Sequence, residues 1–144
     1  MKTVITRVKQ ASVTVDNKLV SEIKNGLLVL VGFTEHDDEN KIDYMVKKIT
    51  NLRIFDDESG IMNKSVKDTN GEILSVSQFT LYGDASNGNR PSYIKALKGV
   101  EAIKLYDLFN KKLNEIIPTK LGIFGANMKV ESINDGPVTI IIEK

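Results

Sequence analysis

The first 33 residues constrain the fold more than any other part of the sequence. Apolar residues alternate or run together through TVITRVKQASVTVDNKLVSEIKNGLLVLVGF, and turn-forming pairs stand at Asp16-Asn17 and Asn25-Gly26. Strand-like sequences broken by such pairs are typical of antiparallel hairpins. We therefore predict three strands at about 2–9, 12–23 and 27–33, arranged as an antiparallel meander.

Two later segments carry apolar residues at helical spacing. The first, KIDYMVKKITNLR, follows Asp37 and Asp38, either of which can cap a helix. The second spans about 99–116 and ends before Pro118. Its predicted apolar stripe comprises Val100, Ile103, Tyr106, Phe109, Leu113 and Ile116.

The remaining segments predict short strands and turns. RIFDDESGIMN predicts a hairpin with its turn at 57–60, and SVSQFTLYG at 75–83 reads as a strand. Two last strands are predicted at about 121–133 and 138–143, joined by a turn at INDGPV. This order of elements predicts an α+β fold, with a mixed, mainly antiparallel or barrel-like sheet and about two covering helices.

Length and composition narrow the class of protein. The 144 residues are expected to form one domain, 1–144, and no cysteine is present for a disulfide or a thiol nucleophile. The longest apolar runs, LLVLVGF and PVTIII, are too short to span a membrane, and no signal peptide is recognised. With 20 Lys and Arg against 19 Asp and Glu, the chain lacks the basic excess of a protein that binds nucleic acid mainly through phosphates, so any such recognition would be local, at a pocket. We expect a cytoplasmic protein without a membrane partner.

The sequence offers few groups for acid–base or metal chemistry. The single histidine, His36, stands in the acidic loop TEHDDEN without further metal ligands at defined spacing, and we expect it to be solvated. Lys64 and Ser65 are adjacent, so on an extended chain they point to opposite faces and do not form a dyad. No metal or cofactor is expected. If the chain is an enzyme, its chemistry must come from hydroxyls, carboxylates, backbone dipoles or the substrate.

Two stretches resist a purely structural interpretation. In SVSQFTLYG, each face of the predicted strand mixes apolar and hydrogen-bonding side chains, with Ser77, Gln78 and Thr80 in a segment otherwise patterned for burial. Threonine also favours strands, and a hydroxyl can bond to neighbouring backbone, so a structural origin stays open. In NDGPVT, Gly136-Pro137 sits between two strong strand sequences. A hairpin turn explains it, but an X-Pro bond can also be cis.

Together these stretches resemble the D-aminoacyl-tRNA deacylase family. SQFTL at 77–81 and NDGPVT at 134–139 carry the resemblance, with NGNRPSY at 87–93, RIFDDESGIMN at 53–63 and the opening TRVKQASVTV. The match runs over nearly the whole chain, and Tyr93 stands where phenylalanine is more usual. The resemblance implies a cytoplasmic homodimer that hydrolyses the ester between a D-amino acid, or glycine, and the 3′-terminal ribose of tRNA. Such an enzyme recycles mischarged tRNA and enforces homochirality in translation.

The resemblance also implies roles for particular residues. Ser77, Gln78, Phe79 and Thr80 are expected to line the reaction centre. Gly136 and Pro137 are expected to form a cis dipeptide that reaches into the partner subunit's site and screens chirality, with Arg7 holding its orientation. Met128 is expected near the bound terminal adenosine of the tRNA.

Several alternatives remain open at this level. Catalysis can be substrate-assisted, with the ribose 2′-hydroxyl helping a water, or covalent, with Thr80 as a nucleophile that lacks an evident base. A non-catalytic module that binds nucleic acid ends and a small-molecule esterase are different classes of function. Five lysines of the second helix and its approach can meet phosphates, although a solvated helix face is the simpler reading: Lys95, Lys98, Lys104, Lys111 and Lys112.

Overall fold

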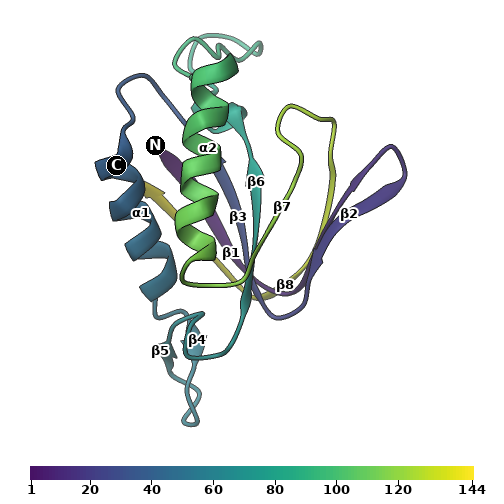
Figure 1. Ribbon diagram of the computed structural model, residues 1–144, viewed down its shortest axis with the longest axis vertical. Coiled ribbons are helices and arrows are strands. Elements are labelled where there is room, and N and C mark those ends of the chain that lie inside the picture. The colour runs from purple at the N-terminus through teal and green to yellow at the C-terminus, as the bar shows by residue number, and fades with distance from the viewer.

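The computed structural model describes all of residues 1–144, and Figure 1 shows a curved six-stranded sheet with two helices on one face. Five strands run in the order β2-β1-β3-β6-β7, and β8 pairs with the other edge of β1. Their bounds are β1 Lys2–Val15, β2 Lys18–Ile23, β3 Gly26–Gly32, β6 Glu72–Ser77, β7 Thr119–Leu121 and β8 Lys129–Glu143. The β3–β6 and β6–β7 pairs are parallel, and all pairs of β1 are antiparallel.

The sheet curls into a nearly closed barrel. Its two end strands, β2 and β7, meet through side chains: the Ser21 hydroxyl donates to the Leu121 carbonyl at 2.6 Å, and the Lys120 ammonium to the Glu22 carbonyl at 2.7 Å. The predicted fold class, α+β with a mixed, barrel-like sheet and two helices, is therefore confirmed. Neither helix is long and apolar enough to cross a membrane.

The predicted meander is wrong, because β3 returns to β1 and not to β2. β1 continues without a break through the predicted gap at 10–11 and ends at the turn Asp16-Asn17, whose positive φ angles of 47° and 61° suit a tight hairpin. β8 pairs with β1 from Lys2 to Thr14 along one edge. β3 and β2 therefore share the other edge, at residues 2–8 and 11–15 of β1 respectively.

The first predicted helix is confirmed as α1, Glu39–Asn51. Asp38 caps it by accepting from the Lys41 backbone N–H at 2.9 Å, and the predicted apolar side chains Ile42, Met45, Val46 and Ile49 are buried. Together with the second helix, α1 covers a core cluster against the sheet.

The second helix, α2, spans Gly99–Asn114, and its predicted apolar stripe is correct at Tyr106, Phe109 and Leu113 but not at its ends. Val100 is 67% exposed and Ile116 46% exposed, whereas Ala102 and Asn110 are buried with Tyr106, Phe109 and Leu113. These buried residues follow helical spacing, so the buried face differs from the predicted one only toward the ends of the helix. Lys112 ties α2 to α1 through the carboxylates of Glu39 and Asp43.

Two of the predicted strands are wrong in extent. The segment 75–83 leaves the sheet at Ser77, and Phe79–Tyr82 form a short 3-10 helix. Gly32 allows this change of direction, because a Cβ at Gly32 would lie 2.8 Å from the Gln78 carbonyl oxygen. The segment 121–133 is likewise divided, since β7 ends at Leu121 and β8 begins only at Lys129. The short hairpin is confirmed, with β4 Phe55–Asp56 and β5 Met62–Lys64 around a turn at 57–60.

Candidate active site

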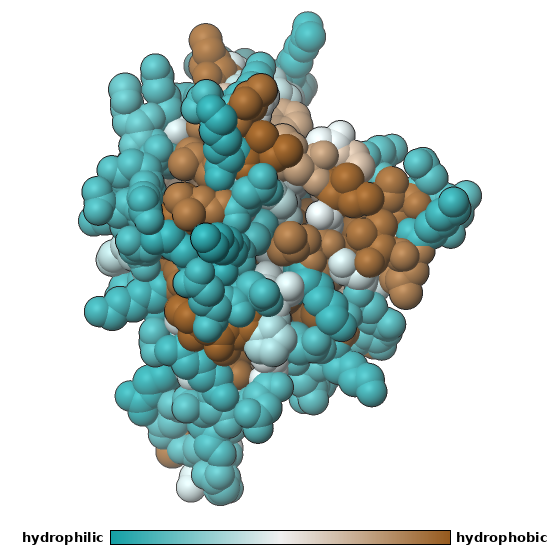
Figure 2. Space-filling model, viewed as in Figure 1, coloured by the Kyte–Doolittle hydropathy of each residue, from teal (hydrophilic) through white to brown (hydrophobic).

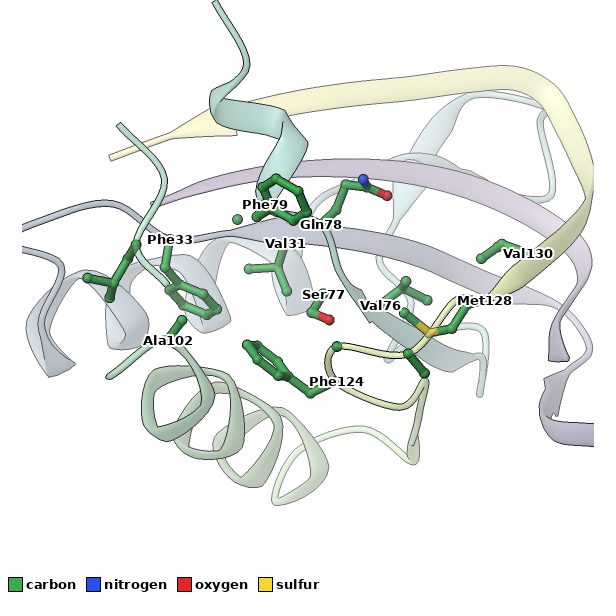
Figure 3. A pocket seen from close by; sticks show the side chains of 14 residues that line it. Val31, Phe33, Val76, Ser77, Gln78, Phe79, Ala102, Phe124, Met128 and Val130 are labelled. Carbon is green, nitrogen blue, oxygen red and sulfur yellow. The ribbon is translucent and has the colours of Figure 1, made fainter. Parts of the chain in front are cut away.

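A cavity of about 280 Å³ lies between the sheet and α2, close to the lower end of the range for ligand sites, about 300–1,000 Å³. Figure 3 shows side chains from β3, β6, α2 and the segment that precedes β8 pointing into one space. Ten of the fourteen lining residues are hydrophobic, so the cavity suits a small, largely apolar or aromatic group. The lining residues are Val31, Gly32, Phe33, Val76, Ser77, Gln78, Phe79, Leu97, Ala102, Phe124, Gly125, Ala126, Met128 and Val130.

Four of the residues predicted from the sequence line this cavity: Ser77, Gln78, Phe79 and Met128. The Ser77 hydroxyl faces the Phe124 ring across the cavity, whereas the Gln78 amide points away from it (Figure 3). That amide donates to the Thr80 hydroxyl oxygen. Thr80 does not line the cavity but lies two residues on from Gln78, at the exposed rim.

The change from strand to 3-10 helix leaves backbone donors at this rim. The Gln78 N–H still donates to the Val31 carbonyl at 2.7 Å, and the first bond inside the turn is from the Leu81 N–H to the Gln78 carbonyl. The Phe79 and Thr80 N–H groups precede that bond, so the helix itself offers them no acceptor. Phe79 is 52% exposed and packs edge-on against Tyr93, with ring centroids 5.2 Å apart.

The second predicted motif forms a bulge in β8, so the predicted hairpin at INDGPV is wrong. Thr139 pairs with Thr6 and Asn134 with Val8, so both flanks bond to the same strand, β1. Residues 135–138 therefore stand opposite the single residue Arg7 and cannot stay in the plane of the sheet. The Gly136-Pro137 peptide bond is cis, as the sequence resemblance implied, and Gly136 has a φ of 119° that favours glycine.

Arg7 holds this bulge against the body of the protein. The residue is 6% exposed. Its Nε donates to the Asp135 carbonyl at 3.3 Å and lies 3.2 Å from the Asp135 carboxylate. Nη1 donates to the Ile54 carbonyl at 2.7 Å and lies 3.5 Å from the Asp56 carboxylate. A planar guanidinium can serve these partners at once. The structure thus brings Arg7, Gly136 and Pro137 together, as predicted.

The bulge and the cavity are separate within one chain. None of residues 134–139 lines the cavity, and Gly136 and Pro137 are exposed. The eight predicted site residues therefore fall into two groups, one around the end of β6 and the other around Arg7.

The other residues considered from the sequence do not come together into a further site. His36 is an exposed loop residue with a φ of 66°, and no group of three or more acidic, histidine or cysteine side chains gathers to hold a metal ion. Lys64 bonds to Glu58 while Ser65 bonds to Asp68, so the two side chains face different partners. Four of the five lysines considered for phosphates are exposed, and the fifth, Lys112, is occupied by Glu39 and Asp43.

Sequence reasoning missed most of the apolar lining. Phe33, Ala102 and Phe124 come from three distant segments, and each looks like an ordinary core residue in its own segment. The one local signal is the pair of small residues Gly125-Ala126, which leave room beside the cavity. Periodicity cannot distinguish a residue that packs from one that lines a cavity.

Comparisons with known proteins show the family and the fold of this chain. A family model described as D-Tyr-tRNA(Tyr) deacylase matches residues 4–143. A solved structure described as "c-Myc DNA Unwinding Element Binding Protein" is 44% identical, with a TM-score of 0.95 and coverage of 100% of this chain and 99% of that one. A second, described as a probable eukaryotic D-amino acid tRNA deacylase, is 17% identical, has a TM-score of 0.82 and covers 98% of this chain and 97% of that one. The second likeness concerns the fold.

Proposed function

This chain belongs to the D-Tyr-tRNA(Tyr) deacylase family and is a hydrolase of D-aminoacyl-tRNA, and we propose that the cavity at the end of β6 is where it acts. It cleaves the ester between a D-amino acid and the 3′-terminal ribose of tRNA. The observation that carries this proposal is that one cavity brings together Ser77, Gln78, Phe79 and Met128 from two segments 50 residues apart, both part of the family match.

The apolar cavity holds the terminal adenosine of the tRNA. Its aromatic wall, with Phe124 and the Met128 thioether, suits a flat base, because stacking on aromatic side chains is a common way to hold unpaired bases. Recognition of one terminal nucleoside needs few phosphate contacts. The near balance of basic and acidic residues in this chain supports such local recognition.

The exposed rim beside the cavity holds the ester. With the adenosine inside, the aminoacyl group lies next to Phe79 and Thr80, whose N–H groups can donate to the oxyanion that forms when a water attacks the carbonyl. The attacking water passes a proton, through the neighbouring ribose 2′-hydroxyl, to the leaving 3′-oxygen. The products are the free D-amino acid and tRNA with a free 3′-hydroxyl. This route needs no histidine or cysteine base.

Thr80 orients the substrate in this account and is not the nucleophile. Its hydroxyl oxygen accepts from the Gln78 amide, which directs the hydroxyl proton outward as a donor. A nucleophilic threonine needs a base to take that proton. The only side-chain partner of Thr80 is an amide, which is not a base.

The bulge in β8 supplies the chirality screen of a second subunit. Gly136 and Pro137 project from a strand none of whose residues is buried, and Ile133 and Ile141 of that strand are 58% and 67% exposed. These features support a homodimer in which the dipeptide of one chain lies beside the rim of the other. A rigid backbone element next to the α-carbon excludes an L side chain and admits D-amino acids and glycine. We place the dimer in the cytoplasm, where aminoacyl-tRNA is used.

The description of the 44% identical relative names a DNA element, and that statement concerns the relative. This chain carries 20 Lys and Arg against 19 Asp and Glu, which does not favour an extended interface with duplex phosphates. Deacylation is therefore the function for which its residues offer a mechanism.

The activity is tested with three substrates under the same conditions: D-tyrosyl-tRNA, L-tyrosyl-tRNA and D-tyrosine methyl ester. We expect release of tyrosine from D-tyrosyl-tRNA alone. Cleavage of the methyl ester at a comparable rate would instead indicate a small-molecule esterase. Binding of tRNA without release would indicate a non-catalytic module.

The contribution of the partner subunit is tested by mixing two defective chains. Phe79→Pro removes a proposed oxyanion donor, and Gly136→Ala displaces the bulge because a Cβ there would lie 2.8 Å from Val138 and 3.3 Å from Arg7. If the bulge acts across subunits, a mixed dimer contains one rim with both elements intact. Mixing should then restore D-selective turnover at that rim. Failure of mixing in a preparation shown by mass spectrometry to contain mixed dimers would contradict the proposal.

A further inference from the structure

A single backbone carbonyl joins three elements behind the cavity. The Ser75 carbonyl on β6 accepts from the Tyr106 hydroxyl of α2 at 2.9 Å. The same oxygen accepts from the Gly122 N–H, at the start of the segment 122–128, also at 2.9 Å. Ser75 is fully buried and Tyr106 is 2% exposed. The relative positions of β6, α2 and segment 122–128 are therefore set at one buried point.

The same three elements supply half of the fourteen residues that line the cavity. β6 contributes Val76 and Ser77, α2 contributes Ala102, and segment 122–128 contributes Phe124 and Met128. Tyr106 does not line the cavity itself. Its ring packs against Phe124 with centroids 5.6 Å apart, so Tyr106 supports the wall by its ring as well as by its hydroxyl.

The interface between α2 and β6 is more polar than packing requires. The Ser75 hydroxyl is buried without a hydrogen-bond partner, and the polar side chain of Asn110 is buried beside Tyr106. Burying such groups is costly, and apolar side chains of similar size would fill the same space at lower cost. Burial also raises the pKa of Tyr106, so its hydroxyl stays protonated, and therefore a donor, further above neutral pH than that of an exposed tyrosine.

We propose that Tyr106 is a positioning residue for adenosine binding, which acts by holding the Ser75 carbonyl and Phe124 in the places that give the cavity its width. This inference rests on the proposed function for the identity of the ligand. Catalytic groups at the rim, Phe79 and Thr80, lie beyond the end of β6 and are not part of this contact. Loss of the Tyr106 hydroxyl should therefore weaken binding and leave turnover of the bound substrate nearly unchanged.

The test compares Tyr106→Phe with Thr50→Val. Thr50 is fully buried in α1 and donates its hydroxyl to the Val46 carbonyl at 2.9 Å, away from the cavity lining. Both variants thus lose one buried hydroxyl that donates to a backbone carbonyl. The readouts are the Kd for adenosine, measured by calorimetry, and KM and kcat for D-tyrosyl-tRNA.

Tyr106→Phe should raise the Kd for adenosine and the KM by about fivefold, the change expected for one hydrogen bond, with kcat within twofold of the unaltered protein. Thr50→Val should lower only the melting temperature. Equal adenosine affinity in both variants would reduce Tyr106 to a core residue and overturn the inference, as would a fall in kcat at constant KM. Lack of adenosine binding by the unaltered protein would also overturn it, whereas binding without deacylation would count against the proposed function alone.

Discussion

The two sequence motifs, the segment around Ser77 and Gly136-Pro137, are held in the structure in different ways. The segment around Ser77 follows β6, a strand paired on both edges and mostly buried. Gly136 and Pro137 belong to β8, which pairs with β1 alone and has no buried residue. The strand that leads to the first motif is paired on both edges as far as Ser75, whereas the bulge is held by one strand and by Arg7.

This difference is consistent with the roles proposed for the two motifs, one as the reaction centre and the other as the chirality screen. A reaction centre requires donors that stay in place, and a strand held between two neighbours provides them. The bulge extends from the surface, and its own chain offers it no cavity to act on. Figure 2 shows a second exposed region. Hydrophobic side chains gather there, over the β2 and β7 side of the sheet that the helices leave uncovered. In β2, β7 and the segment that follows β7, Leu19, Leu121 and Ile123 are exposed.

The largest effect is expected at the rim, from Phe79→Pro. Proline lacks the N–H, and it fits the first position of a 3-10 helix after Gln78, whose φ of −144° and ψ of 83° lie outside the α region. Relative to Phe79→Ala, which removes the ring and keeps the N–H, we expect kcat to fall by about 10²–10³. Single-turnover kinetics with D-tyrosyl-tRNA provide the measurement. Equal rates for the two variants would remove the Phe79 N–H from the mechanism.

A substitution in the bulge should alter selectivity more than rate. Gly136→Ala strains a residue with a φ of 119° and should lower the preference for D- over L-tyrosyl-tRNA by about tenfold or more, while D-deacylation stays within a few-fold. Gly60→Ala is the matched control, because Gly60 has a φ of 75° and open space around it in the β4–β5 turn. If Gly136→Ala instead lowered the rate with D-tyrosyl-tRNA and kept the preference for D- over L-substrate, the bulge would act on rate as the rim does. The proposed difference between the two regions would then be wrong.

A smaller effect is expected from Thr80→Ala. If Thr80 only orients the substrate through one hydrogen bond, kcat/KM should fall by about fivefold to tenfold. A covalent route would abolish turnover and would trap an acyl-enzyme in the unaltered protein, which intact-mass spectrometry can detect. Thr80→Ser keeps the hydroxyl and should recover most of the activity in either case.

The smallest effect concerns stability at high pH. Burial raises the pKa of Tyr106 above its ordinary value of about 10, so the folded state holds this proton more tightly than the unfolded state. Its contribution to the free energy of unfolding is complete below pH 10. It is lost as pH rises further, by up to about 1.4 kcal/mol per pH unit. Denaturant melts between pH 9 and pH 11 should show a shallower decline for Tyr106→Phe. The exposed bulge should contribute no such slope.

The fold class and the two motifs could be predicted from the sequence, but their immediate structural context could not. Turn chemistry at Asp16-Asn17 and helical spacing after Asp38 are local signals. The β1–β2 turn and α1 lie where these signals predict them. The β3 strand returns to β1 because β1 is long enough for two partners on one edge, and no local pattern carries that information.

The same limit applies to the candidate site. The end of β6 at Ser77 depends on the missing side chain of Gly32, which is 45 residues away in sequence. The bulge depends on Arg7 and on two flanks that pair with one strand. Local propensities predict a longer strand for 75–83 and a hairpin for 134–139, since each assignment is reasonable for the isolated segment.

The pairing of β1 with β8 has a consequence for synthesis of the protein. Lys2 of β1 pairs with Glu143 of β8, so the edge of β1 that faces β8 stays unpaired until β8 has left the ribosome. Pairs so distant in sequence form late, because the loop between them must first be closed. All but one of the residues that line the cavity are made before β8, so the bulge at Gly136-Pro137, the proposed chirality screen, is the last of these parts to be placed. In the proposed dimer, a newly made chain can therefore complete its partner's site only when its own first and last strands have met.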